Sequence, residues 1–129
     1  VFAPKKSARH YRKGFPDSLD GAPFVMPTEN TVLRRMLDHW FARRQINPRV
    51  LAEFEDSALL KAFTQTTPAL FAAPSVIKES IADLYGAVDI GSAEGVRERF
   101  FAISLERRVR NPAVMRLVEA AHEKLFDFA

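Results

Sequence analysis

The sequence predicts an α/β fold: a parallel or mixed sheet with flanking helices. Short apolar runs alternate along the chain with segments that have one apolar face, and strands that alternate with helices favour parallel pairing. Hydrophobic residues make up 47% of the 129 residues, which is enough for a packed core. Such a sheet is covered on both sides, and its ligands bind beyond the carboxyl ends of the strands.

Composition excludes several classes of function. The chain has no cysteine, which rules out disulfides, thiolate zinc sites and a cysteine nucleophile. A net charge of +3 is only mildly basic and does not by itself indicate nucleic acid. No apolar run approaches roughly 18 residues, so no membrane span is expected. The chain begins at Val1 and "VFAP" looks like the end of a strand already under way, so we expect a fragment.

The first basic segment, "KKSARHYRK" from Lys5 to Lys13, has two interpretations. Clustered basic residues with one aromatic residue are compatible with a nucleic-acid patch. Alternatively, Ala8 and Tyr11 form the inner face of a short helix whose charges face water. The second interpretation is favoured, because a basic cluster alone is weak evidence.

The next segment predicts a strand, a polar turn and a helix. Phe24 to Met26 is a short apolar run, and Asn30 is the predicted N-cap. From Val32 to Phe41 the apolar residues form one wide stripe. The opposite, polar face is predicted to carry Arg34, Arg35, Asp38, His39, Arg43 and Arg44. The turn caps this helix, and its free N–H groups could also hold an anion.

A second strand, Val50 to Phe54, precedes another helix, "SALLKAFTQ", with Asp56 as the predicted N-cap. Strand alternation places Glu53 and Glu55 on one face, where with Asp56 they could bind a hard cation. Solvated carboxylates are the favoured interpretation, because acids are common on surfaces. No metal site is therefore predicted.

The remaining elements follow the same alternation. "ALFAA", Ala69 to Ala73, is a predicted strand, and Ser75 is the predicted cap of "VIKESIADLY", which ends at Gly86. "AVDIG" is a further short strand, and "RERFFAISLER" is a longer extended segment. Asn111 before Pro112 predicts the start of a last helix. Its buried face is predicted to carry Val114, Val118, Ala121 and Leu125.

Signals of catalysis are absent from the sequence. No G-x-S-x-G surrounds a serine, and the five glycines form neither a G-x-G-x-x-G nor a P-loop. His10, His39 and His122 lie far apart and lack metal-ligand spacing. We therefore predict no enzyme, no catalytic residue and no cofactor.

Three stretches taken together resemble a known family: "PFVMPTENTVLRRMLDHWF", "EFEDSALLKAFTQTTPALFAAPSVI" and "VRERFFAISLERRVRNPAVMRLVEAA". They are similar to the effector-binding domain of LysR-type transcriptional regulators. Within that family they are most similar to the NhaR-like branch, whose best-known member activates a sodium/proton antiporter. The likeness covers nearly all of the chain, and "RERFFAISLERR" is its most specific part.

The resemblance implies a periplasmic-binding-protein-like domain of two α/β lobes joined by two crossover strands. Residues 1–4 would be one crossover strand and residues 5–95 the second lobe. Residues 96–129 would hold the other crossover, near Arg97 to Leu105, and a C-terminal helix that returns to the first lobe. The opening half of that lobe and the N-terminal winged helix-turn-helix, which contacts DNA in this family, would lie outside the chain. Many relatives carry glycines where this chain has Gln65-Thr66-Thr67-Pro68, so its cleft floor is expected to differ.

The function implied is the effector-sensing and oligomerisation portion of a cytoplasmic regulator. It would respond to sodium or lithium, control a cation/proton antiporter, self-associate, and reach DNA only through the winged helix-turn-helix. The alternative is a fragment of a periplasmic-type solute-binding protein, which shares the two-lobed architecture. The residues expected to line the effector cleft are Thr28, Asn30, Thr31, Glu55, Asp56, Ser57, Phe71, Pro74 and Ser75.

Overall fold

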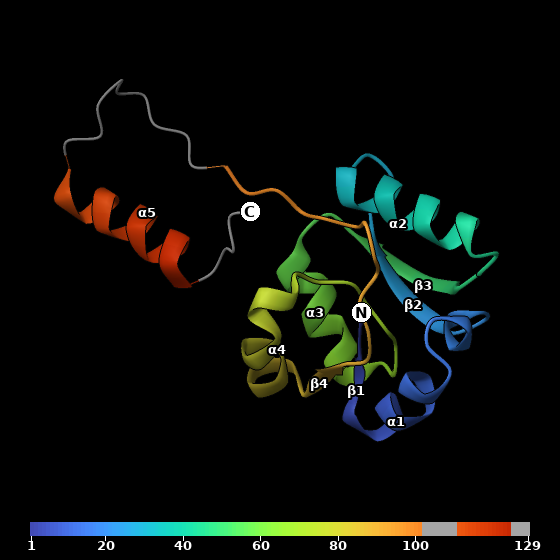
Figure 1. The fold of residues 1–129 in the computed structure, drawn as a ribbon. Coiled ribbons are helices and arrows are strands. Elements are labelled where there is room, and N and C mark those ends of the chain that lie inside the picture. The colour runs from blue at the N-terminus through green and yellow to red at the C-terminus, as the bar shows by residue number, and fades with distance from the viewer. Residues whose placement is uncertain (102–110, 125–129) are drawn as a thin grey trace. The chain divides into compact units, whose positions relative to one another are not determined.

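The computed structural model describes residues 1–101 and 111–124, and the chain divides into two compact units, Val1–Glu98 and Arg99–Ala129 (Figure 1). The first unit contains four strands and four α-helices, joined by two short 3-10 helices, among its described residues. In chain order these elements are β1 (Phe2–Pro4), α1 (Lys5–Lys13), η1 (Asp17–Leu19), β2 (Pro23–Pro27), α2 (Val32–Arg43), β3 (Arg49–Phe54), α3 (Ser57–Thr66), η2 (Ser75–Ile77), α4 (Lys78–Tyr85) and β4 (Ala87–Asp89).

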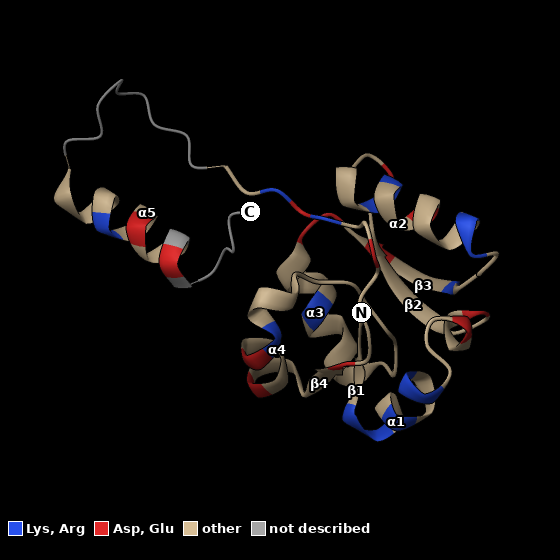
Figure 2. Ribbon diagram, in the orientation of Figure 1, with Lys and Arg blue, Asp and Glu red and all other residues tan. Residues whose placement is uncertain are grey.

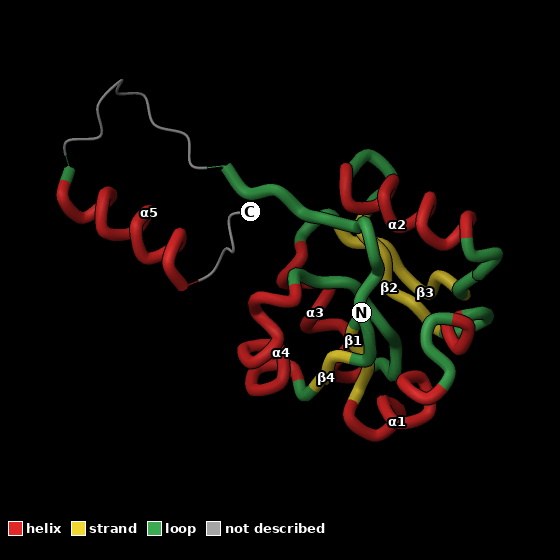
Figure 3. The backbone as a smooth tube through the Cα atoms, viewed as in Figure 1, coloured by secondary structure: helices red, strands yellow, loops and turns green. Residues whose placement is uncertain are grey.

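The strands form two two-stranded sheets in the centre of the first unit, which isolated bridges join into one mixed sheet (Figure 3). β2 pairs in parallel with β3, and β1 pairs antiparallel with β4. Residues 69–71 join the two pairs, because Leu70 bridges Phe24 in parallel and Phe71 bridges Phe2 antiparallel. The order across the sheet is therefore β3, β2, residues 69–71, β1 and β4. The strand predicted from Ala69 to Ala73 is present only as these bridges.

Helices cover both faces of the sheet, as the alternation of elements predicts. Phe24 and Met26 of β2 belong to one core cluster with residues of α1 and α2, including Trp40. Val25, between them, belongs to a second cluster with Leu60 of α3 and with residues of α4 and β4. Successive side chains of a strand point to opposite faces, so β2 is buried on both sides.

In the first unit, two of the predicted helix ends are confirmed and two are wrong. The Asp56 carboxylate caps α3, and Gly86 ends α4 in the left-handed conformation at φ 64°. The cap of α2 is Thr31, whose hydroxyl accepts from the Arg34 N–H, and not Asn30. Ser75 makes no side-chain cap, because the turn η2 intervenes before α4 begins.

The predicted faces of α2 need one correction. Leu37, Trp40 and Phe41 are buried as predicted. Arg34 was expected on the solvent face but is only 8% exposed, whereas Val32 at the helix start is 62% exposed. The pattern identifies the helix correctly, but the hydrogen bond to the Pro27 carbonyl of β2 and the ion pair with Glu53 of β3 hold Arg34 inward.

Residues after β4 pack back onto α2. Ala93 and Val96 contact the same core cluster as Trp40, and Arg44 pairs with Glu94 at 3.5 Å. Residues 97–101 have no regular secondary structure, and the rest of the predicted extended segment lies outside the described residues.

The second unit holds the helix α5 (Pro112–Lys124). Asn111 caps it as predicted, since its carbonyl oxygen Oδ1 accepts from the Ala113 N–H at 2.9 Å. Val114 was expected on a buried face but is 40% exposed, and Leu117 is 74% exposed. Val118 and Ala121 are half-buried, and Leu125 lies outside the described residues.

In the part of the chain that the structure describes, each helix is too short or too polar to cross a bilayer.

A candidate effector-binding edge

The carboxyl ends of three strand segments meet at one edge of the sheet. β2, β3 and residues 69–71 run parallel, so the turns that follow them emerge on the same side. The Thr28 N–H donates to the Phe54 carbonyl at 3.2 Å, which joins the first two turns directly. We call residues Thr28–Thr31, Glu55–Ser57 and Pro74–Ser75 the carboxyl edge.

The turn after β2 is closed by its own hydrogen bonds. The Thr31 N–H and hydroxyl both donate to the Thr28 carbonyl, at 3.1 and 3.0 Å. The Thr28 hydroxyl donates to Asn30 Oδ1 at 2.9 Å. Asn30 is exposed, while Thr28 and Thr31 are half-buried. The cap therefore uses the Thr31 hydroxyl, and Asn30 keeps its amide N–H₂ group toward solvent.

Arg34 connects this turn to the neighbouring strand. Its Nη1 donates to the Pro27 carbonyl at 2.8 Å and to Glu53 Oε1 at 2.6 Å, and its Nε lies 3.0 Å from both oxygens of Asp38. One guanidinium thus ties together the carboxyl ends of β2 and β3 and the next turn of α2. Its planar, forked donors allow this, whereas a lysine has no such geometry.

The charge state of Arg34 follows from these partners. Burial lowers the pKa of Arg34, but the hydrogen bonds to Glu53 and Asp38 and their negative charges outweigh burial, so the pKa is raised. The guanidinium stays charged at every accessible pH. Its two carboxylate partners leave the cluster with one excess negative charge.

The turn after β3 is built differently. The Asp56 carboxylate accepts from the Ala58 and Leu59 N–H groups at 2.7 and 2.9 Å. The hydrogen bond from Leu59 and then that from Ala58 lower the pKa of Asp56. Glu55 and Ser57 beside it are exposed, and Glu55 has no partner among the described residues.

The third turn contributes less polar surface than expected. Phe71 is fully buried and stacks on Phe2 with ring centroids 5.5 Å apart, so its side chain supports the edge from the core and does not line it. Pro74 is half-buried and Ser75 is exposed.

The three carboxylates considered as a cation site are not assembled into one. Glu53 is paired with Arg34, and Asp56 accepts from two backbone N–H groups. Among the described residues no group of three or more histidine, cysteine or acidic side chains could hold a metal ion.

Apolar side chains accompany the polar ones at this edge. Val32 opens α2, Leu59 lies in the first turn of α3, and Val76 lies in η2; they are 62%, 61% and 40% exposed. One exposed apolar residue therefore stands at the start of each helical segment that follows these turns. Ligand sites commonly combine apolar side chains with a few polar groups.

A model of the family described as the LysR substrate binding domain matches residues 1–126. The chain belongs to this family. Its fold is that of the periplasmic binding proteins, with which the mixed, two-faced sheet of the first unit agrees. The resemblance inferred from the three quoted stretches is thereby confirmed.

Two curated relatives are both named transcriptional activator protein NhaR, one from Escherichia coli (strain K12) and one from Shigella flexneri. Each is 35% identical over 115 residues, which is 89% of this chain and 38% of the relative. The LysR substrate-binding domain described here thus spans little more than a third of their length. No solved structure matches the chain.

The sequence predicted that the three turns converge on one edge of the sheet, as observed, but gave no role to Arg34. The signal available was its spacing of four residues from Asp38, a pairing distance on a helix. The contacts with Pro27 and Glu53 depend on the sheet and have no local signature.

Proposed function

We propose that the chain is the effector-sensing portion of a LysR-type transcriptional regulator, and that its carboxyl edge forms one wall of the effector cleft. The supporting observation is the convergence of three polar turns at one edge of a domain of this family. The first lobe would supply the opposite wall. In this proposal the regulator is cytoplasmic and not an enzyme, and it recognises its operator through a winged helix-turn-helix outside this chain.

We further propose that the effector is sodium or lithium and that the regulated gene encodes a cation/proton antiporter. The electrostatics of the edge are favourable to a cation, because the acids there outnumber the two arginines that reach the first turn, Arg34 and Arg35. These acids are Glu29, Asp38, Glu53 and Glu55. Figure 2 shows acidic residues, coloured red, where β3 leads into α3. The edge alone offers no complete oxygen cage, so ligands from the first lobe would complete it.

Calorimetric titration of the complete regulator tests this function. Sodium chloride and lithium chloride should produce a saturable signal that potassium chloride at equal ionic strength does not. The double variant Thr28→Val with Asn30→Ala removes polar groups from the edge and should weaken binding about tenfold, the loss expected for one or two hydrogen bonds.

The matched control is His39→Ala, an exposed residue of α2 that is not part of the carboxyl edge. It should bind like the wild type. Equal responses to all three salts would refute the cation effector, and small organic acids should then be titrated. The isolated chain should respond weakly, because half of the cleft is missing and its preorganisation is lost.

We also propose that α5 packs on the first lobe in the complete protein and drives self-association of the isolated chain. Val114, Met115 and Leu117 are exposed along it, and exposed apolar surface tends to find a partner. In the family, effector domains also pair side by side, and exchange of this helix between two chains is a second route to a dimer.

Light scattering over a concentration series checks this proposal. The double variant Leu117→Glu with Val118→Glu should lower the apparent mass toward that of the monomer, whereas Glu119→Gln on the same helix should not. A wild-type chain that stays monomeric at high concentration would contradict it.

A further inference from the structure

The surface of α1 is the strongest feature that the effector edge does not use. Five of its nine residues are Lys or Arg, coloured blue in Figure 2, a sixth is His10, and none is acidic. All six side chains are exposed. Lys5, Lys6, Arg9 and Lys13 have no partner among the described residues.

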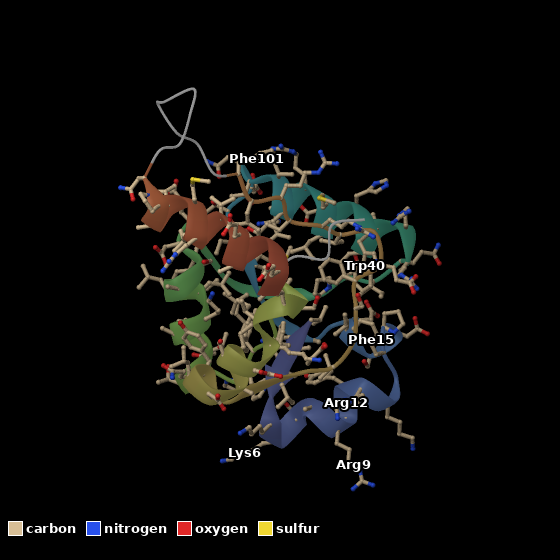
Figure 4. All side chains as sticks on the ribbon, turned by 60° about the vertical axis from the view of Figure 1, so that its left-hand side comes forward. Lys6, Arg9, Arg12, Phe15, Trp40 and Phe101 are labelled. Carbon is tan, nitrogen blue, oxygen red and sulfur yellow. The ribbon has the colours of Figure 1, made fainter. Side chains whose placement is uncertain are left out.

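The basic side chains share one face of the helix. At 3.6 residues per turn, Lys5, Lys6, Arg9, Arg12 and Lys13 fall within about a third of the circumference. Ala8 and Tyr11 lie outside this arc and pack against the core. Figure 4 shows Lys6 and Arg9 pointing away from the body of the unit. We call these five residues the α1 basic face.

The α1 basic face is held in place by the fold. Arg12 donates to the Asp89 carbonyl at 2.6 Å, which ties the helix to β4, and Ala8 is 4% exposed. The four other charges are therefore presented by a helix of fixed orientation. A surface that needs no ordering loses less entropy when a ligand binds.

Topology places this face far from the carboxyl edge. β1 pairs antiparallel with residue 71, whose segment runs toward the carboxyl edge, so β1 runs away from it. α1 follows β1 directly and begins at the opposite edge of the sheet. A ligand on α1 and an effector at the carboxyl edge therefore do not compete for space.

We propose that the α1 basic face is a contact surface for the phosphate backbone of double-stranded DNA. Its length from Lys5 to Lys13 is about 12 Å at 1.5 Å per residue. For a helix that lies along the duplex axis, this equals the rise of three to four phosphates of one strand at about 3.4 Å each. The contact carries no sequence information, since it reaches phosphates and not base edges. It would add non-specific affinity to the operator contacts of the proposed helix-turn-helix, and it departs from the expectation that DNA is reached only through that domain.

The choice of DNA over other polyanions rests on the proposed function, whereas the α1 basic face itself does not depend on it. The effector titration described above does not involve α1, so either proposal can fail while the other stands.

The test is fluorescence anisotropy of a short random-sequence duplex titrated with this chain. Binding should be weak, with a Kd of about 10⁻⁴ to 10⁻⁶ M, and a log–log plot against salt should have a slope of about −3, because about three phosphates are neutralised. The triple variant Lys6→Gln, Arg9→Gln and Lys13→Gln keeps the Arg12 anchor. It should lose about tenfold or more in affinity, and each substitution should flatten the salt slope by about one unit.

The matched control removes three exposed positive charges from other elements of the same unit through Arg43→Gln, Arg49→Gln and Lys78→Gln. It should keep its affinity within about twofold if α1 is the contact. Equal losses in the two triple variants would overturn the proposal in favour of general charge attraction. It would also be overturned by absence of binding at low salt, or by poly-glutamate competing as well as DNA, which would indicate an acidic protein as the partner.

Discussion

Two turns at the same edge of the sheet follow the same sequence pattern but are held by different contacts. Each follows a parallel strand, contains polar residues and starts a helix. The turn from β2 to α2 is held by the Thr31 cap and by the buried guanidinium of Arg34, whose side chain is 10% exposed. The turn from β3 to α3 is held by the exposed carboxylate of Asp56.

The difference teaches which part of the edge is fixed. Arg34 makes four contacts that reach three elements, so the first turn moves only with β2, β3 and α2 together. The second turn depends on two hydrogen bonds that water can replace. We therefore expect the first turn to define the shape of the edge and the second to adjust when a ligand binds.

The largest effect is expected from removing Arg34. Arg34→Met keeps the apolar stem but leaves the Pro27 carbonyl and Glu53 without their donor, which should lower the free energy of unfolding by about 2–3 kcal/mol. The carboxylates are partly exposed, which keeps the loss below that of a fully buried pair. Urea unfolding followed by fluorescence of Trp40, the single tryptophan and 1% exposed, measures it.

The neighbouring exposed residue supplies the control for that experiment. Arg35→Met removes the same charge and should change stability by less than about 0.5 kcal/mol. If both variants lose the same amount, the Arg34 network has no special role and the comparison between the turns fails.

A smaller effect is expected from the acidic partner of Arg34. Glu53→Gln keeps the shape of the side chain and one hydrogen bond but removes the charge. This should lower the free energy of unfolding by about 1–2 kcal/mol. Glu55→Gln, two residues away and unpaired among the described residues, should be nearly neutral. The urea unfolding midpoints of the two variants compare these losses of stability directly. A larger loss for Glu55→Gln would contradict the role given to the Arg34–Glu53 pair.

The elements of this fold were largely readable from sequence, because each depends on local patterns. Alternating apolar runs indicated the strands, and the stripe ending in Trp40 and Phe41 indicated α2. Asp56 and Asn111 were found as caps because each is the one suitable side chain directly before its helix. At α2 two suitable residues stand side by side, and the backbone selected Thr31 over Asn30.

What sequence did not indicate depends on contacts between distant segments. Residues 69–71 join two strand pairs that are far apart in the chain. Their apolar composition predicts an extended segment but does not indicate which strands it pairs with. The family resemblance places Phe71 at the cleft, yet its position opposite Phe2 buries it. Arg34 was assigned to water because a helical pattern records polarity and not the acids of β3.

The smallest effect is expected at Asp56, and it depends on pH. Its folded-state pKa is lowered, so its stabilising contribution is present above the unfolded value of about 3.9 and is lost as pH falls through the folded pKa. Asp56→Asn keeps a capping oxygen without the charge. The gap in urea midpoint between wild type and variant should therefore narrow as the pH is lowered from 7 to about 3, and a constant gap would show that the charge does not stabilise α3.

The central claim is that the carboxyl edge, and not another surface, faces the effector. Amide hydrogen exchange of the complete regulator in sodium chloride against potassium chloride at equal concentration tests it most directly. We predict that sodium slows exchange in residues 28–31 and 55–59, most strongly in the second turn, and leaves residues 5–13 of α1 unchanged. Sodium-dependent protection that spares both turns, or no difference between the two salts, would contradict the account.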